Sequence, residues 1–155
     1  MPGEIILDTQ LLVLYVVGLA SPRYIKQHKR LRDVYTEVDF DLLSSMLERA
    51  TRVIVPVNVY TEASNFLSSY IAEPARTRIM EKFRELIMAR GEDYVPSERA
   101  AGRPEFIRLG LADAALLDAG DPSWTLLTAD YDLYAAACRC HRPVENFNHI
   151  REAYL

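Results

Sequence analysis

Short apolar runs alternate along this chain with longer segments whose apolar residues recur every three or four positions. The runs predict strands at Glu4–Leu7, Arg52–Val57 and Trp124–Ala129, and Val144–Phe147 is expected to add an edge strand. The segments between them carry no β-hairpin signal. Because parallel strands need long crossover connections, the pattern predicts an α/β fold: a single domain with a central parallel β-sheet and helices on both faces.

Helical periodicity between the strands sets the expected helices. The first is predicted from Gln10 to about Val17, stopped by Gly18 and Pro22. Pro22 is expected to begin helical sequence that reaches about Tyr35, and the helical stretch from Pro22 to Arg49 is expected to form a long crossover between the first two strands. Residues 92–102 are predicted to be irregular, with room for a short strand at 93–95. Further helices are expected from Asp39 or Asp41 to about Arg49, from Asn58 or Thr61 to about Ile71, from Ala75 to Arg90, from Tyr131 to Cys140, and at the C-terminus. Pro104 is expected to begin helical sequence that Gly110 breaks, and a separate helix is expected from Leu111 to Ala119.

Composition narrows the class of protein. The chain has 155 residues and is 50% hydrophobic, which is enough for one domain with its own core. Its longest apolar run, Leu11–Ala20, is shorter than the roughly 20 residues that span a bilayer. Glu4 and Asp8 precede this run and no Lys or Arg does, unlike a signal peptide. We therefore expect a cytoplasmic protein with no membrane partner.

Four acidic residues lie next to apolar segments, where an ordinary solvent-exposed acid is not expected. Asp8 and Asp130 end predicted strands, whereas Glu62 and Asp113 lie beside apolar side chains on predicted helices. Carboxylates near a core are unfavourable unless they are paired, neutralised or metal-bound. The carboxyl ends of parallel strands meet at one edge of a sheet, so all four are expected to face one crevice. Oxygen ligands favour Mg²⁺ or Mn²⁺, and two such ions can activate water against a phosphodiester.

Individually, these residues also have structural explanations. Asp8 and Asp130 can cap the helices that follow them, and Glu62 can be a first-turn acid favoured by the helix dipole. The supporting residues Thr9, Asn65, Thr128 and Asp132 lie beside the acids in sequence or at helical spacing, and the same choice between structure and function stays open for them.

Charge gives a mixed indication about nucleic acid. The net charge is 18 − 22 = −4, which is unlike most nucleic-acid binders. If the four special acids bind cations, the rest of the protein is neutral (18 − 18 = 0). Between Asp8 and Asp33 there are no acids, and this segment is basic. A solvated helix face is the alternative, but four of its residues are candidates for binding RNA phosphates: Arg23, Lys26, Lys29 and Arg30.

Four segments in order, IILDTQLL, VPVNVYTEASNFL, LGLADAALLDAG and LLTADYDLYAAA, resemble the PIN-domain ribonucleases, which include the VapC-like toxins of toxin–antitoxin pairs. The resemblance implies that the four acids form the metal site, with Thr128 and Asp132 beside it. It also implies Mg²⁺ or Mn²⁺ as cofactor, RNA as substrate, a homodimer and, for toxins, a cognate antitoxin. Gln10 and the long helical stretch after Pro22 depart from the family pattern.

The main hypothesis is therefore a metal-dependent endoribonuclease that leaves a 5′-phosphate and a 3′-hydroxyl. One alternative is a small-molecule phosphohydrolase or phosphoacceptor domain, although the chain lacks both Asp-x-Asp after its first strand and a Lys after Leu126. Another is a non-catalytic RNA- or protein-binding module.

Overall fold

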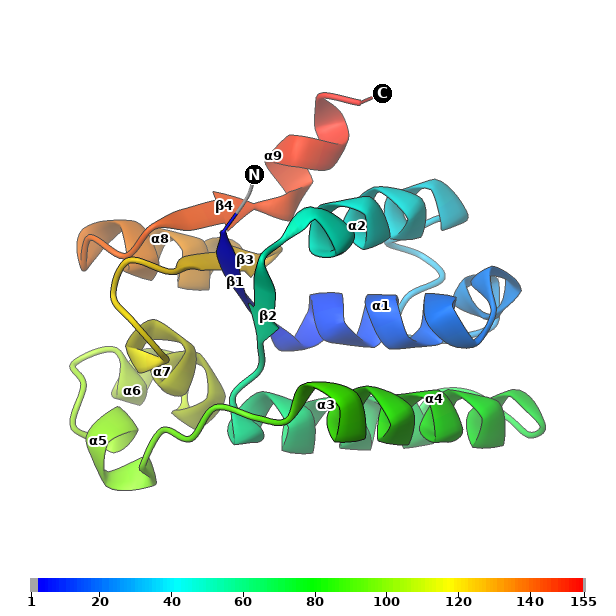
Figure 1. Cartoon of the computed structure of the whole chain (residues 1–155), viewed down its shortest axis with the longest axis horizontal. Helices are drawn as coiled ribbons and strands as arrows, with labels where there is room; N and C mark the ends of the chain where they lie inside the picture. The colour runs from blue at the N-terminus through cyan, green and yellow to red at the C-terminus, as the bar shows by residue number, and fades with distance from the viewer. Residues whose placement is uncertain (1–2, 155) are drawn as a thin grey trace.

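A four-stranded parallel sheet forms the centre of the computed structural model, which describes residues 3–154. Its strands are β1 (Glu4–Leu7), β2 (Arg52–Ile54), β3 (Thr125–Thr128) and β4 (Val144–Asn146), in the spatial order β2-β1-β3-β4 (Figure 1). The predicted α/β class and parallel sheet are confirmed. The strands end close to the predicted positions, except that β2 stops at Ile54, before Pro56, which has no N–H to donate to a ladder.

Strand β1 is central and has a neighbour on each side. Ile6 pairs with Ile54 of β2 and with Leu126 of β3. The chain steps from β1 to β2 in one direction and then from β2 back past β1 to β3 in the other. Because crossovers between parallel strands are right-handed, these opposite steps place helices on both faces of the sheet.

Most predicted helices are present in the described residues, with two differences besides the segment after Pro22: α5 forms within residues 92–102, which were predicted to be irregular, and α2 starts at Glu37 with Thr36 as its N-cap, before Asp39 and Asp41. Helices α3 and α4 form an antiparallel pair, and α1 packs against both of them and against α2 (Figure 1). Their bounds are α1 (Thr9–Ala20), α2 (Glu37–Arg49), α3 (Val57–Ser69), α4 (Ala75–Arg90), α5 (Ser97–Ala101), α6 (Phe106–Leu109), α7 (Leu111–Asp118), α8 (Tyr131–Arg139) and α9 (Phe147–Glu152), with a 3₁₀ helix, η1, at Pro22–Lys26.

Helix α1 is the apolar centre of the molecule. Every residue from Leu11 to Val17 is buried, as expected for a helix that is hydrophobic on all sides. The prediction that Gly18 ends this helix is wrong, because α1 continues to Ala20. Gly18 instead allows close packing: a Cβ at this position would overlap the ring of Phe40 on α2. Across residues 3–154, neither α1 nor any other helix is long and apolar enough to cross a membrane.

The basic segment after Pro22 is not the continuous helix that its sequence predicts. It forms η1 and then a series of turns up to residue 34. The chain bends here because it is attached to α3: the Lys29 N–H donates to the carbonyl of Tyr70 at 2.9 Å, and the buried His28 ring lies 3.1 Å from the carbonyl oxygen of Phe66. The strand expected near Asp93 is a single bridge to Pro56.

The contact between Gly18 and Phe40 gives a stability test. Replacing Gly with Ala inside a helix normally stabilises it by about 0.5–1 kcal/mol. Here we expect Gly18→Ala to lower the free energy of unfolding by about 1–3 kcal/mol, because the methyl group overpacks against the Phe40 ring. Urea denaturation measures this change, and Phe40→Leu in the same background should restore part of it. A Gly18→Ala protein as stable as the wild type would contradict this account.

Candidate active site

Asp8 and Asp130 are joined through one buried threonine. Asp8 follows β1, is 5% exposed and accepts a hydrogen bond from the Thr9 N–H at 2.6 Å. The hydroxyl of Thr128, at the end of β3, donates to the other Asp8 carboxylate oxygen at 2.6 Å and accepts from the Asp130 N–H at 2.9 Å. Since β1 and β3 are adjacent and parallel, their carboxyl ends place both acids at one edge of the sheet.

Both acids also cap helices, as the structural alternative predicted. Asp8 is the N-cap of α1, and Asp130 is the N-cap of α8, accepting from the N–H groups of Asp132 at 2.8 Å and Leu133 at 3.2 Å. In each case one carboxylate oxygen makes the capping bond. Capping therefore orients these side chains without using all of their oxygen lone pairs.

Glu62 and Asp113 reach the site from helices α3 and α7, and both are partly buried. Asp113 lies in the first turn of α7, directly after Gly110, whose φ of +87° lets the chain turn sharply from α6 into α7. The predicted break at Gly110 is confirmed. This turn directs the start of α7 towards the strand ends.

The four carboxylates line one cavity of about 240 Å³, together with Thr9, Gln10, Arg30, Phe66 and the turn around Gly110. The structure thus brings together acids from four distant parts of the chain, as predicted. No Lys, Arg or His among residues 3–154 lies within ion-pair distance of any of the four. No basic side chain therefore pairs directly with these acids, although Arg30 lines the same cavity.

This arrangement raises the pKa of the Asp8 carboxyl to about 6. Burial is the largest cause, and the charges of Asp130 and Glu62 add to it. The hydrogen bonds from Thr128 and Thr9 act in the opposite direction. Asp8 thus behaves as a buried acid that its hydrogen bonds only partly stabilise in the charged form.

Asp113 shows the same effect more strongly. The pKa of its carboxyl is raised to about 7: burial is the largest cause, and the nearby negative charges of the other site acids add to it. These charges belong to Asp8, Asp130, Glu62 and Asp132. The predicted neighbour Asp132, although exposed, therefore contributes to the electrostatic potential of the site.

The donor chemistry suits a hard divalent cation: the set is all-oxygen and anionic, and the buried Thr9 hydroxyl that lines the cavity has no hydrogen-bond partner within residues 3–154. However, in the same part of the chain no group of three or more His, Cys, Asp or Glu side chains is arranged so that it could hold an ion. The acids face one cavity but do not form a finished coordination shell. The strands and helices bring the four acids to one cavity, and the like charges of their carboxylates repel one another there.

Arg30 is the one predicted RNA-binding residue that lines this cavity. Its guanidinium lies 3.6 Å from the centroid of the Phe66 ring, and its Nε donates to the side-chain oxygen of Gln10 at 3.0 Å. Neither Gln10 nor Phe66 was predicted as a site residue. The position of Phe66, four residues after Glu62 on the same side of a helix, was the signal that was available.

Other predicted residues lie outside the cavity. The side chains of Arg23, Lys26 and Lys29 are exposed and do not line it, and neither does Asn65. No family model, curated protein or solved structure matches the chain. The resemblance to PIN-domain ribonucleases therefore stays a prediction that rests on the residues quoted above.

The raised pKa of Asp8 predicts how stability depends on pH when divalent ions are chelated. Between pH 4 and 6 the folded protein keeps a proton on Asp8 that the unfolded chain has released, so this contribution to stability is complete below pH 4 and is lost as the pH rises through 6. The loss is roughly 3 kcal/mol, at 1.36 kcal/mol per pK unit. Urea denaturation in EDTA should show a flatter pH dependence for Asp8→Asn than for the wild type. The exposed acid variant Asp33→Asn is the control, and equal slopes for all three proteins would contradict the prediction.

Proposed function

We propose that this protein is a divalent-metal-dependent endoribonuclease related to the PIN-domain family. The observation that carries the proposal is the cavity at the carboxyl edge of the sheet, where four carboxylates from distant segments meet without a basic partner. Structural capping accounts for Asp8 and Asp130, and the helix dipole favours Asp113 in the first turn of α7, but neither explains Glu62, which lies beyond the first turn of α3. A cation site accounts for all four.

In this proposal Asp8, Glu62, Asp113 and Asp130 would hold Mg²⁺ or Mn²⁺, with Asp132 beside them. When bound, the ion would neutralise their charge and supply the Lewis acid and activated water that phosphodiester hydrolysis requires. The contribution of the protein's own residues is to position these carboxylates. Thr128 holds the Asp8 carboxylate and the Asp130 backbone at the same time, so the ends of β1 and β3 keep a constant spacing.

Arg30 provides a positive charge with which a nucleic-acid phosphate would interact. Its guanidinium is stacked on Phe66 and held by Gln10, and it makes no ion pair with the acids. An RNA phosphate that enters the cavity would therefore meet a cation already held in place beside the carboxylates. Arg23, Lys26 and Lys29 are proposed to attract the rest of the RNA backbone.

A non-catalytic RNA-binding module is the second candidate. The finding that favours it is the lack, in residues 3–154, of a group of side chains arranged to hold a metal ion. The two candidates share the basic segment and Arg30 but differ in whether the carboxylates bind a cation. A cognate antitoxin and a homodimer remain predictions of the family resemblance, and a cytoplasmic location remains a prediction from the amino-acid sequence.

Cleavage tests the main candidate. We expect Mn²⁺ to support hydrolysis of single-stranded RNA to products with 5′-phosphates, and EDTA to abolish it. Asp8→Asn and Asp113→Asn should each lower the rate at least about 100-fold, because each removes a charged oxygen that would bind the cation. Asp33→Asn, at an exposed acid outside the cavity, should cleave at the wild-type rate. Cleavage that survives both cavity substitutions would refute the assignment.

Ion binding separates the two candidates without a substrate. A ligand that binds only the folded state raises its stability by about 2.7 kcal/mol at 100 times its dissociation constant. Mn²⁺ should therefore raise the melting temperature of the wild type, and this shift should be much smaller for Asp113→Asn. RNA binding by a wild-type protein whose melting temperature does not respond to Mn²⁺ would instead support the non-catalytic module.

A further inference from the structure

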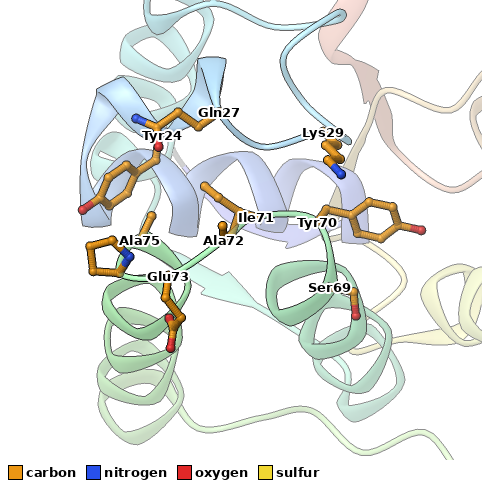
Figure 2. A pocket seen from close by; sticks show the side chains of 10 residues that line it. Tyr24, Gln27, Lys29, Ser69, Tyr70, Ile71, Ala72, Glu73 and Ala75 are labelled. Carbon is orange, nitrogen blue, oxygen red and sulfur yellow. The ribbon is translucent and has the colours of Figure 1, made fainter.

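The two basic residues that follow His28 line different cavities. Arg30 lines the carboxylate cavity, around which the four acids lie, whereas Lys29 lines a second cavity of about 600 Å³ between η1 and the turn that joins α3 to α4. Figure 2 shows the rings of Tyr24 and Tyr70 directed out of this second cavity and away from each other, so neither ring offers it a stacking face. Among the residues that line the carboxylate cavity, Arg30 carries the positive charge.

Two contacts hold the guanidinium of Arg30. It lies 3.6 Å from the centroid of the Phe66 ring, and its Nε donates to Oε1 of Gln10 at 3.0 Å. Phe66 follows Glu62 by four residues on α3, so the cation is stacked on the same helix that carries one of the four acids. The hydrogen bonds of Arg30 within residues 3–154 use its backbone and Nε and leave the two terminal nitrogens for a phosphate.

The buried ring of His28 holds the backbone of Arg30. The Arg30 N–H donates to Nδ1 of His28 at 3.3 Å, and Nε2 lies 3.1 Å from the carbonyl oxygen of Phe66. Burial lowers the pKa of His28 and the charge of Arg30 adds to this effect, whereas the bond to Phe66 acts in the opposite direction. The ring is therefore neutral at pH 7, with its proton on Nε2, which donates to Phe66 while Nδ1 accepts from Arg30.

These contacts close a loop through three residues. His28 binds the carbonyl of Phe66, the ring of Phe66 contacts the guanidinium of Arg30, and the N–H of Arg30 returns to His28. Without the Nδ1 acceptor, the Arg30 N–H loses its partner and the turn at residues 28–30 is released. Without the Nε2 donor, that turn keeps its bond. If His28 only filled a buried space, both losses would affect Arg30 equally.

We infer that His28 is a positioning residue of the proposed RNA site: its Nδ1 fixes the Arg30 backbone so that the guanidinium stays stacked on Phe66, in the carboxylate cavity, where it meets an RNA phosphate. The inference rests on the proposed function, because that function supplies RNA as the ligand. His28 does not line the cavity and acts through Arg30.

Nuclear magnetic resonance observes Arg30 without RNA. In the wild type the Arg30 Nε–H should give a ¹H–¹⁵N signal shifted upfield by the Phe66 ring, identified by its loss in Arg30→Ala. Two variants each keep one half of the imidazole. The Oδ1 of His28→Asn can accept in place of Nδ1, whereas the amide of His28→Gln can reach the Phe66 carbonyl in place of Nε2. We expect His28→Asn to keep the shifted signal and His28→Gln to lose it.

RNA binding gives the second readout, by fluorescence anisotropy of a labelled single-stranded octaribonucleotide in EDTA. Arg30→Ala should weaken binding about 10- to 100-fold, because it removes a charge-assisted hydrogen bond to phosphate. His28→Gln should weaken binding at least about fivefold alone but less than about twofold in the Arg30→Ala background, since it acts through Arg30. His28→Asn should bind within about threefold of the wild type, because the Arg30 bond is kept.

The matched control is His149→Asn, at an exposed histidine on α9 that does not line the carboxylate cavity. It should keep both the Arg30 signal and the wild-type affinity. Thermal melts establish that each variant is folded. His28→Asn and His28→Gln each lose one of the two ring hydrogen bonds, so a difference between them at similar melting temperatures reports on Arg30 and not on global stability.

Three results would overturn the positioning role: an Arg30 signal that is unchanged in His28→Gln, its loss in His28→Asn as well, or a His28→Gln effect on RNA affinity that is equal with and without Arg30. The proposed function fails separately. A wild type that neither binds nor cleaves RNA would refute the nuclease, while the Arg30 signal in the two His28 variants would still decide whether His28 positions Arg30.

Discussion

The hydrogen bond from Thr128 to Asp8 ties the ends of the two central strands together, and the site depends on it. It places a carboxylate that is 5% exposed at the carboxyl edge of the sheet, where Asp130 follows two residues after Thr128. Every further acid that reaches this edge raises the electrostatic cost of charging Asp8 and Asp113. Four carboxylates surround this cavity, and no basic residue forms an ion pair with them. Keeping them charged is electrostatically unfavourable, whereas apolar side chains at the same edge of the sheet would not carry this cost.

Packing around α1 makes that arrangement possible. This helix begins at the Asp8 cap and is buried along most of its length, so the position of Asp8 is coupled to the hydrophobic core. Helix α3 packs against α1 and carries Glu62, and the contact between α3 and α7 brings in Asp113. The acids are therefore positioned by the same contacts that stabilise the fold.

The basic segment after η1 connects the two cavities. His28, buried against α3, holds Lys29 beside one cavity and Arg30 beside the other. The negative site and the positive segment lie next to each other without forming ion pairs. Such an arrangement suits a polyanion, which the arginine and lysine attract and the carboxylates accept only with a cation present.

The sequence by itself determined the α/β class, the parallel strands and the four acids that share a cavity. These follow from local rules: apolar runs of strand length alternate with helical periodicity, and Asp at the end of a strand lies at the carboxyl edge of a parallel sheet. Gly110 was also predictable as a break, because glycine disfavours the continuation of a helix and adopts the positive φ that a sharp turn needs.

Only the tertiary structure decided the rest. The sequence predicts that Gly18 ends a helix. In the structure, its lack of a side chain instead leaves room for the ring of Phe40, a residue 22 positions away. The segment after Pro22 reads as a helix, but hydrogen bonds from Lys29 and His28 to α3 turn it instead. Arg30 reaches the carboxylate cavity and Lys29 does not, because these long-range contacts, and not the local periodicity, direct the two side chains to different cavities.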